Sequence, residues 1–454
     1  MRAGAVRGVS PRSISAVLSL MLTAACAPAP HPSAPAPADS IRSAAGAPLS
    51  PDDDAFLEDL SRRSFRFFWD QADPATGIVR DRAQIDGSPH DDRNGDVGSI
   101  AATGFGLAGL CVAAERRWLP RAQAVERATA TLRFFSQRSY HNHGWFYHFI
   151  NIHTGAREWQ NEISSIDTAL LLAGILTVRQ CFDDDREVVI YADAIYRRVD
   201  FQWMLAGDPL LLAHGWKPES GFLKSRWDHY CELMILYLLA IGSPTHPIVA
   251  ASWRAWSRPA MTFEAFTYVS GPDPLFVHQY SQAWVDFRGW GEPWAPQIDW
   301  WQNSIAATRA HKAFCLTLTK DFPGYGDHVW GITASDSPRG YVAWGGPPRH
   351  PDIDGTVVPC AAAGSLMLAP DITVPAVREM HRRFGDRIYG MYGFADAFNP
   401  TTGWVNPDVI GIDLGITLLS AENLRTGNVW RWFMRNAEIP RAMRAAGLTR
   451  EPTR

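Results

Sequence analysis

Apolar residues recur at helical spacing along most of the chain, from Asp52 to about Asn436. Few segments show the strict alternation of apolar and polar residues that half-buried strands require. The pattern predicts twelve helices, over residues 53–71, 98–117, 121–138, 163–181, 184–204, 227–241, 247–257, 278–288, 301–321, 355–368, 374–384 and 412–436. We therefore expect an all-α fold.

The predicted helices alternate between two kinds. The even-numbered ones are small and apolar nearly all round, as in GSIAATGFGLAGL and ISSIDTALLLAG, so they should be buried on both sides. The odd-numbered ones, such as AQAVERATATLRFF, carry a charged face and should lie outside. This alternation predicts an (α/α)₆ barrel. The rival architecture, a helical solenoid, would show a repeat of fixed period, and the sequence has none.

Acidic residues stand at the starts of the predicted inner helices. If these helices are parallel, their first turns meet at one mouth of the barrel and bring together Asp96, Glu162, Asp167, Asp228, Glu232, Asp354 and Asp413. Helix capping is the alternative explanation for each of them, and the stronger one for Asp96 and Asp354.

Glu232 fits the capping explanation poorly. It lies in WDHYCELMILYLLA beside Cys231, Leu233 and Met234. Apolar surroundings raise the pKa of a carboxyl group, as a general acid working near neutral pH requires. Glu162 precedes an apolar run, whereas Asp167 lies inside it, where a bond to a neighbouring helix is the alternative role.

The composition narrows the choice of substrate. The net charge is −4 and no Lys/Arg-rich tract occurs, which argues against a nucleic-acid partner and against a polyanionic substrate. The chain has 19 Trp against only 20% charged residues, and aromatic rings stack on the apolar faces of sugars. An uncharged polysaccharide is the substrate class that fits, although Trp also fills large helical cores.

Several loops combine aromatic rings with Gly, Pro and planar polar groups, among them HNHGWFYHFIN, FRGWGEPWAPQIDWW and WGITASDSPRGYVAWGG. The chain has no HExxH, phosphate-loop or GxSxG motif, so we expect neither a metal nor a cofactor. His141, His143 and His148 are therefore interpreted as substrate or structural contacts.

The first residues have the layout of an export signal. Arg2, Arg7 and Arg12 precede an apolar run that ends at Cys26, in a sequence resembling a lipobox. We expect a signal sequence over 1–26, a Pro/Ala/Ser-rich linker over 27–50 and one domain over 51–454. The expected product is a monomeric periplasmic lipoprotein, anchored to the outer membrane through lipid on Cys26. Ordinary cleavage to a soluble protein is the alternative.

Five cysteines follow Cys26, at positions 111, 181, 231, 315 and 360. Their number is odd and none stands at a CxxC spacing, so the sequence indicates neither a disulfide framework nor a zinc site. We expect small buried side chains.

Seven motifs in order resemble the bacterial glycoamylase-like domain of glycoside hydrolase family 144. They are SSIDTALLLAG, ELMILYLLAIGSPTHP, HQYSQAWVDFR, WGITASDSPRGY, DGTVVPCAAAGSL, YGFADAFN and GIDLGITLLSAENLRTGNVW. The resemblance covers nearly all of the chain from Asp52 onward. It implies an (α/α)₆ barrel and anomer-inverting hydrolysis of β-1,2-glucan to sophorose or sophorooligosaccharides. The older glucoamylase label implies α-glucan activity, which remains an alternative.

The resemblance also implies roles for individual residues. Glu232 matches the general acid of the ELMILY-type helix, and Glu162 matches a second acidic position. A third acidic position falls here on Trp159 or Gln160, and Gln282 replaces an expected His. Such departures bear on linkage, chain length and endo or exo mode. The residues expected to bind substrate are Asp96, Trp145, Asp167, His278, Trp284, Asp286, Arg288, Trp330, Asp336, Tyr341, Asp354 and Asp413.

Two other functional classes stay open at this point. A non-catalytic, lipid-anchored glycan-binding protein would share the Trp-rich loops but would not need Glu232 in an apolar wall. A polysaccharide lyase needs an acidic α-proton, hence a uronic acid substrate and a basic cleft, and the sequence lacks the basic clusters.

Overall fold

The computed structural model describes residues 49–88, 95–294 and 296–450. The expected signal sequence, Cys26 and all but the last two residues of the expected linker lie outside the described residues. Within the described residues, no helix combines the length and the apolar character needed to cross a membrane.

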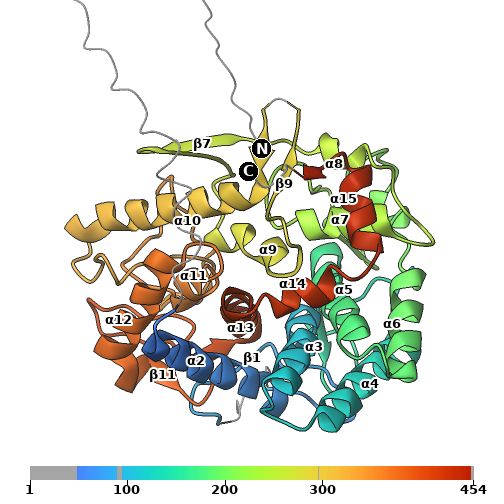
Figure 1. Ribbon diagram of the computed structural model, residues 1–454, viewed down its shortest axis with the longest axis horizontal. Helices are drawn as coiled ribbons and strands as arrows, with labels where there is room; N and C mark the ends of the chain where they lie inside the picture. Colours follow the sequence, from blue (N-terminus) through green and yellow to red (C-terminus); the bar gives the residue numbers. More distant parts are fainter. Residues whose placement is uncertain (1–48, 89–94, 295, 451–454) are drawn as a thin grey trace, which may run out of the picture.

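Twelve helices alternate along the chain between an inner and an outer position (Figure 1). The inner helices are α3 (Ile100–Glu115), α5 (Ser165–Cys181), α7 (Met234–Gly242), α9 (Tyr280–Trp284), α11 (Pro359–Ala363) and α13 (Gly411–Arg425). The outer helices are α2 (Pro51–Asp70), α4 (Arg121–Gln137), α6 (Arg186–Arg198), α8 (Ser252–Ala255), α10 (Trp300–Thr317) and α12 (Pro370–Ile388). Two further helices, α14 (Asn428–Phe433) and α15 (Glu438–Ala445), follow α13.

Short strands and three 3₁₀ turns connect the helices. The strands are β1 (Arg82–Gln84), β2 (Val97–Ser99), β3 (Phe149–Asn151), β4 (Ile163–Ser164), β5 (Gly215–Lys217), β6 (Gly221–Phe222), β7 (Ala260–Phe263), β8 (Phe266–Val269), β9 (Trp290–Glu292), β10 (Ile298–Asp299), β11 (Tyr389–Gly390), β12 (Gly393–Phe394), β13 (Asp408–Ile410) and β14 (Thr449–Arg450). The 3₁₀ turns are η1 (Trp203–Leu205), η2 (Leu275–His278) and η3 (Leu318–Lys320). All the pairs are antiparallel and at most four residues long, which is too short for the periodicity to reveal.

The inner helices are apolar all round because both of their sides are covered. All nine residues of α7 are buried, and so is every residue of α3 from Ile100 to Ala113. The outer helices α4 and α6 bury one face and leave their charged residues in solvent. The helix-rich fold that the sequence predicts is therefore confirmed.

Contacts link each inner helix to the next. Helix α3 packs against α5 and α13, α5 against α7, and α13 against α11. Between α7 and α9, the Ser281 hydroxyl donates a hydrogen bond to the Glu232 carbonyl over 2.9 Å. Between α9 and α11, the Gln279 amide donates to the Ala361 carbonyl over 2.9 Å. The contacts between successive inner helices therefore lead from α3 through α5, α7, α9, α11 and α13 and back to α3.

Several predicted helices differ from the observed ones in their bounds. Residues 227–233 were expected to be helical, but Asp228 and Tyr230 pair through their backbones with Ser257, so α7 begins only at Met234. The range 412–436 is broken at Gly427, whose φ of 68° lies in the left-handed region and ends the helix. Helix α15 was not expected.

The backbones of α3 and α5 touch at two glycines. A Cβ atom built on Gly174 would lie 2.0 Å from the carbonyl oxygen of Gly104, and one built on Gly104 would lie 2.3 Å from that of Leu170. Only glycine fits at this crossing.

We predict that Gly174→Ala destabilises the fold by about 1–3 kcal/mol, because overlap with the α3 backbone outweighs the better helix propensity of Ala. Denaturant unfolding of the variant measures this difference. Gly326→Ala is the matched control, since its Cβ meets nothing within 4 Å. Equal stability of the two variants would contradict the close approach of α3 and α5.

Candidate active site

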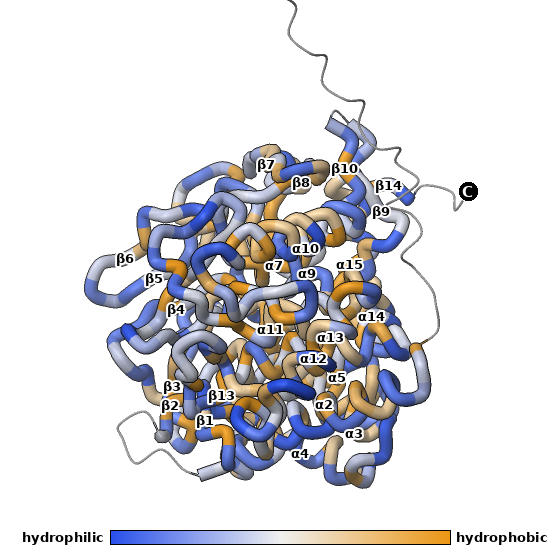
Figure 2. Tube along the Cα trace, turned by 90° about the vertical axis from the view of Figure 1, so that its left-hand side faces the viewer, coloured by the Kyte–Doolittle hydropathy of each residue, from blue (hydrophilic) through white to orange (hydrophobic). Residues whose placement is uncertain are grey.

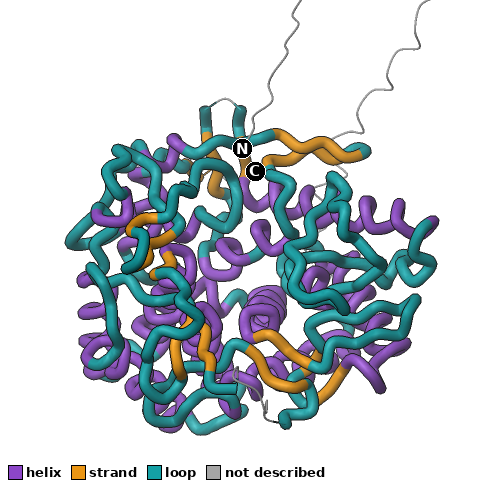
Figure 3. Tube along the Cα trace, turned by 180° about the vertical axis from the view of Figure 1, so that it is seen from behind, coloured by secondary structure: helices purple, strands orange, loops and turns teal. Residues whose placement is uncertain are grey.

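The first turns of three inner helices meet around a shared set of backbone hydrogen bonds. The Asp81 carbonyl accepts from Gly411 at the start of α13, and the Asp81 amide donates to Val97 in β2, just before α3. The His148 carbonyl accepts from Ile100 of α3, and the His148 amide donates to Glu162, just before α5. In Figure 2, β1 to β6 and β13 lie on the opposite side of the molecule from α14 and α15. Figure 3 shows the loops and short strands that cover this end.

Glu232 lies in the turn that leads into α7, partly exposed at this end. Burial raises the pKa of its carboxyl group to about 7, and the negative charges of Asp273 and Asp167 add to the rise. A carboxyl group with this pKa keeps its proton near neutral pH and can still release it. The sequence predicted a raised pKa from the apolar neighbours of Glu232, and the structure has one. A carboxyl group of this kind is suited to act as a general acid.

Asp273 is a site residue that the sequence did not reveal. One of its carboxylate oxygens, Oδ2, is buried and lies 4.0 Å from His229 Nε2. His229 Nδ1 in turn lies 2.7 Å from a carboxylate oxygen of Asp228, so the ring stands between two acids. Burial raises the pKa of Asp273, and the nearby His229 opposes that rise. A single Asp in the loop SGPDPLF offered no periodic signal that could have identified it.

Glu162 and Asp167 are joined through His148. The ring nitrogens lie 3.3 Å from a carboxylate oxygen of each acid. Burial opposes the charge on the ring, but the two carboxylates prevail and raise the pKa of His148. The hydrogen bond from His148 lowers the pKa of Glu162. Glu162 is therefore ionised at the pH at which Glu232 still holds its proton.

A second group of carboxyls surrounds Arg82 on the other wall. The guanidinium lies 2.8 Å from Asp336 and 3.1 Å from Asp81. Asn406 donates to Asp396 over 2.9 Å, and the backbone amide of Asp336 donates to the same Asp396 oxygen over 2.9 Å. These contacts fix the loop that carries Asp336 against β1.

Asp396 and Asp413 form a buried carboxyl pair within this second group. Burial raises the pKa of Asp396 to about 6, while burial and the charge of Asp396 raise the pKa of Asp413 well above its usual range. Two carboxyls in contact away from water disfavour the state in which both are ionised, so the pair gives up its second proton less readily than its first.

Tyr341 stands between the two groups of acids. It is 65% exposed, yet the surrounding walls and the charges of Asp413, Asp396, Glu232 and Asp336 raise the pKa of its hydroxyl to about 12. Tyr341 is thus an exposed ring flanked by carboxyls from several elements, and we call the exposed region between the two groups of acids the cleft. An accessible Tyr ring is suited to stacking on a sugar.

Four aromatic residues expected to bind substrate are core residues instead. Trp145, Trp284 and Trp330 are 0% exposed. His278 is buried between Tyr230 and Ser270, and burial lowers the pKa of its ring to about 3. Their rings are covered by protein, so the prediction that they contact substrate is corrected.

The remaining expected residues occupy other places. Asp96 is exposed and pairs with Arg80 over 3.5 Å. Asp354 accepts a hydrogen bond from the Thr356 amide over 3.0 Å, which is a local turn contact. Asp286 pairs with Arg288 over 2.7 Å, and Arg288 covers Trp430 of α14, away from the cleft. None of these four residues joins the carboxyl groups around Glu232.

Among the described residues, no three His, Cys, Asp or Glu side chains are arranged to hold a metal ion.

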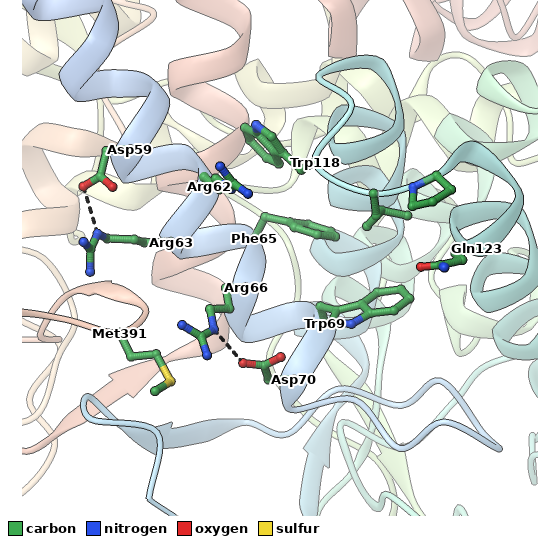
Figure 4. Close-up of a pocket in the computed structure, with 12 residues that line it drawn as sticks. Asp59, Arg62, Arg63, Phe65, Arg66, Trp69, Asp70, Trp118, Gln123 and Met391 are labelled. Carbon is green, nitrogen blue, oxygen red and sulfur yellow. Dashed lines mark hydrogen bonds and ion pairs between the residues drawn. The ribbon is translucent and has the colours of Figure 1, made fainter.

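A separate hollow lies on the outer wall between α2 and the start of α4 (Figure 4). Its charged side chains pair with each other, Arg63 with Asp59 over 2.8 Å and Arg66 with Asp70 over 2.9 Å. The carboxyls around Glu232 do not line it.

We predict that Glu232→Gln makes the protein more stable above neutral pH. The unfolded Glu ionises near 4.5 and the folded one near 7, so rising pH favours the unfolded chain across that interval. The variant lacks this loss and should be more stable by about 2–3 kcal/mol at pH 8, with the difference vanishing near pH 4. Denaturant unfolding at both pH values measures it, and a difference independent of pH would contradict the raised pKa.

Comparison with known proteins supports the assignment of the fold. Residues 224–437 match the family model described as "Glycoamylase: Putative glucoamylase". This match includes Glu232, Asp273, Tyr341 and Asp413.

The chain is 28% identical to an exo β-1,2-glucooligosaccharide sophorohydrolase (non-reducing end) from Parabacteroides distasonis, over 86% of this chain. It spans 57% of the length of that curated relative.

Two solved structures share the fold. The endo-β-1,2-glucanase of Chitinophaga pinensis, in complex with sophorotriose and glucose, has a TM-score of 0.81 at 28% identity, over 88% of this chain and 99% of that one. The β-1,2-glucanase of Parabacteroides distasonis has a TM-score of 0.80 at 25% identity, over 88% of this chain and 60% of that one. The resemblance predicted from the motifs is confirmed: residues 224–437 match the glycoamylase family model, and both solved structures share the fold.

Proposed function

We propose that this protein hydrolyses β-1,2-glucan to sophorose or short sophorooligosaccharides, with inversion at the anomeric carbon. The observation that carries the proposal is the position of Glu232, protonated near neutral pH, in the same cleft as the ionised Glu162. The activities of the Parabacteroides sophorohydrolase and of the Chitinophaga endo-β-1,2-glucanase support the substrate class.

The proposed architecture is an (α/α)₆ barrel. Six inner helices, joined by contacts that return to α3, and six outer helices that alternate with them along the chain support it. In such a barrel the N-termini of the inner helices lie at the same end. Glu162, Asp167, Glu232 and Asp413 are all at or just before the first turns of these helices.

The proposed mechanism uses Glu232 as the general acid and Glu162 as the general base. Glu232 gives its proton to the glycosidic oxygen as the bond to the anomeric carbon breaks. A water molecule attacks that carbon from the opposite face and loses a proton to Glu162, directly or through a substrate hydroxyl and a further water. His148 holds Glu162 ionised before the reaction.

The two walls of the cleft suit a bent chain. A β-1,2-linked glucan turns sharply at each residue, so its rings need partners on more than one side. Asp336 lies on the side of Arg82, His148 and Glu162 lie on the other side, and Tyr341 stands between the two groups. We propose that Tyr341 stacks on a sugar ring. Asp336, Asp413 and Asp167 would form hydrogen bonds with sugar hydroxyl groups.

We also propose that the protein is an exported, monomeric lipoprotein of the periplasm. The leader layout and the lipobox-like sequence at Cys26 support export, and the Pro/Ala/Ser-rich linker suits a tether between lipid and the catalytic domain.

We predict that the purified protein releases sophorose and short sophorooligosaccharides from linear β-1,2-glucan. Starch, β-1,3-glucan and β-1,4-glucan should give little product. Chromatography of the digests identifies the products, and NMR of fresh digests should show the α-anomer first. Glu232→Gln should lower turnover by about 10²–10⁴-fold with folding unchanged.

Three outcomes would overturn this assignment. Efficient release of glucose from starch would identify a glucoamylase. Binding of glucans without new reducing ends would identify a capture protein. Full activity of Glu232→Gln would exclude the proposed acid.

We predict that Asp273→Asn shifts the alkaline limb of the pH–kcat/KM profile to lower pH. The charge on Asp273 raises the pKa of Glu232, so its removal lets Glu232 lose its proton at a lower pH. Asp286→Asn is the matched control, because Asp286 pairs with Arg288 outside the cleft and should leave the limb in place. A limb that does not move in Asp273→Asn would separate Asp273 from the acid.

A further inference from the structure

Two cysteines lie on the facing sides of the inner helices α3 and α5, about two turns beyond the point where these helices touch. The two helices touch at Gly104 and Gly174, where a Cβ on Gly174 would lie 2.0 Å from the Gly104 oxygen. Cys111 follows Gly104 by seven residues, and Cys181 follows Gly174 by seven residues. Seven residues of α-helix fall about 20° short of two full turns, so each Cys leaves its helix on the same side as its glycine.

The equal spacing places the cysteines level because the helices run in the same direction. At their starts, residues 146–148 bond to both helices: His148 accepts from Ile100 of α3, and Phe146 accepts from Ser164 next to α5. At the other end, α14 packs against both α3 and α5. The register set at Gly104 and Gly174 therefore carries on to Cys111 and Cys181.

The two thiols differ in their exposure to solvent. Cys111 is fully buried, whereas Cys181 is the last residue of α5 and is partly exposed. Burial raises the pKa of the Cys111 thiol, and the neighbouring Cys181 adds to the rise, as expected from the shared register of the two helices. A reagent can reach Cys181 from solvent, and Cys111 then has one neighbour to react with.

The other described cysteines have different neighbours. Cys315 lies 3.6 Å from His311 Nε2, and Cys231 donates to the His229 carbonyl over 3.4 Å. Cys360 contacts Asp413. The close approach of α3 and α5 singles out one pair.

We propose that Cys111 and Cys181 form a disulfide when the protein meets a disulfide-bearing thiol oxidant. The Cys181 thiolate attacks the oxidant disulfide, forms a mixed disulfide and displaces one thiol. The Cys111 sulfur then attacks Cys181, forms the protein S–S bond and displaces the second thiol. The two cysteines lose two electrons to the oxidant, and their protons are carried by the two thiols it becomes.

This pairing revises the expectation drawn from cysteine spacing alone. The five cysteines were expected to be isolated buried side chains, because an odd number without a CxxC spacing indicates no framework. The bond would tie two inner helices together and close the segment between positions 111 and 181, restricting the unfolded chain. The proposal of this disulfide does not depend on the proposed substrate.

Peptide mapping tests the proposal directly. One sample of the protein is incubated with oxidised glutathione and another with dithiothreitol, and free thiols are then alkylated in denaturant. Trypsin cuts after Arg93, Arg116, Arg179 and Arg186, which places the two cysteines in peptides 94–116 and 180–186. We expect these peptides linked and unalkylated after oxidation, with Cys315 alkylated in both samples. Alkylation of both Cys111 and Cys181 after oxidation would overturn the proposal.

Variants add a second readout. Oxidised wild-type protein should melt a few degrees above the reduced protein, because the cross-link restricts the unfolded state. Cys111→Ser should abolish this shift and stop the reaction at the mixed disulfide between Cys181 and glutathione, which the peptide map detects on peptide 180–186. Cys315→Ser, a substitution at another buried thiol, should keep the shift. If Cys111→Ser fails to fold, the wild-type peptide map alone decides.

Discussion

The structure depends on one constraint: helices that are apolar on every side must be surrounded by other helices. The inner helices α3, α5, α7 and α13 have no polar face to give to water, so they pack against each other and against the outer helices. Polar chemistry can then occur only at their ends. The acids of the cleft stand at these ends because the helix walls exclude them, and burial among apolar neighbours raises the pKa of Glu232.

Opposite proton affinities follow from two different surroundings in one cleft. Glu232 lies against apolar residues with only other acids nearby, so its charged form is disfavoured. Glu162 accepts a hydrogen bond from His148, a ring that two carboxylates keep charged, so its charged form is favoured. A hydrolase that works by acid–base catalysis needs one carboxyl of each kind, and the fold supplies both without a metal or a cofactor in the proposed steps.

Much of this could be predicted from the sequence, and what could not has physical reasons. The small, apolar composition of α3 and α5 predicted their burial, and the apolar neighbours of Glu232 predicted its raised pKa. Trp145, Trp284 and Trp330 could not be separated from exposed tryptophans, because a ring that fills a core and a ring that stacks on sugar have the same composition signal. Asp273 was missed as a member of the site, and the pairing of His148 with Glu162 and Asp167 was not predicted, because the partners come from different segments of the chain.

The most direct test of the account is a crystal structure of the Glu232→Gln variant with a β-1,2-linked gluco-oligosaccharide. The account predicts a glycosidic oxygen within hydrogen-bond distance of the side chain at position 232, with a sugar ring against Tyr341 and a water molecule on the side of Glu162. An oligosaccharide bound elsewhere, or bound in the cleft with its glycosidic oxygens far from position 232, would contradict it.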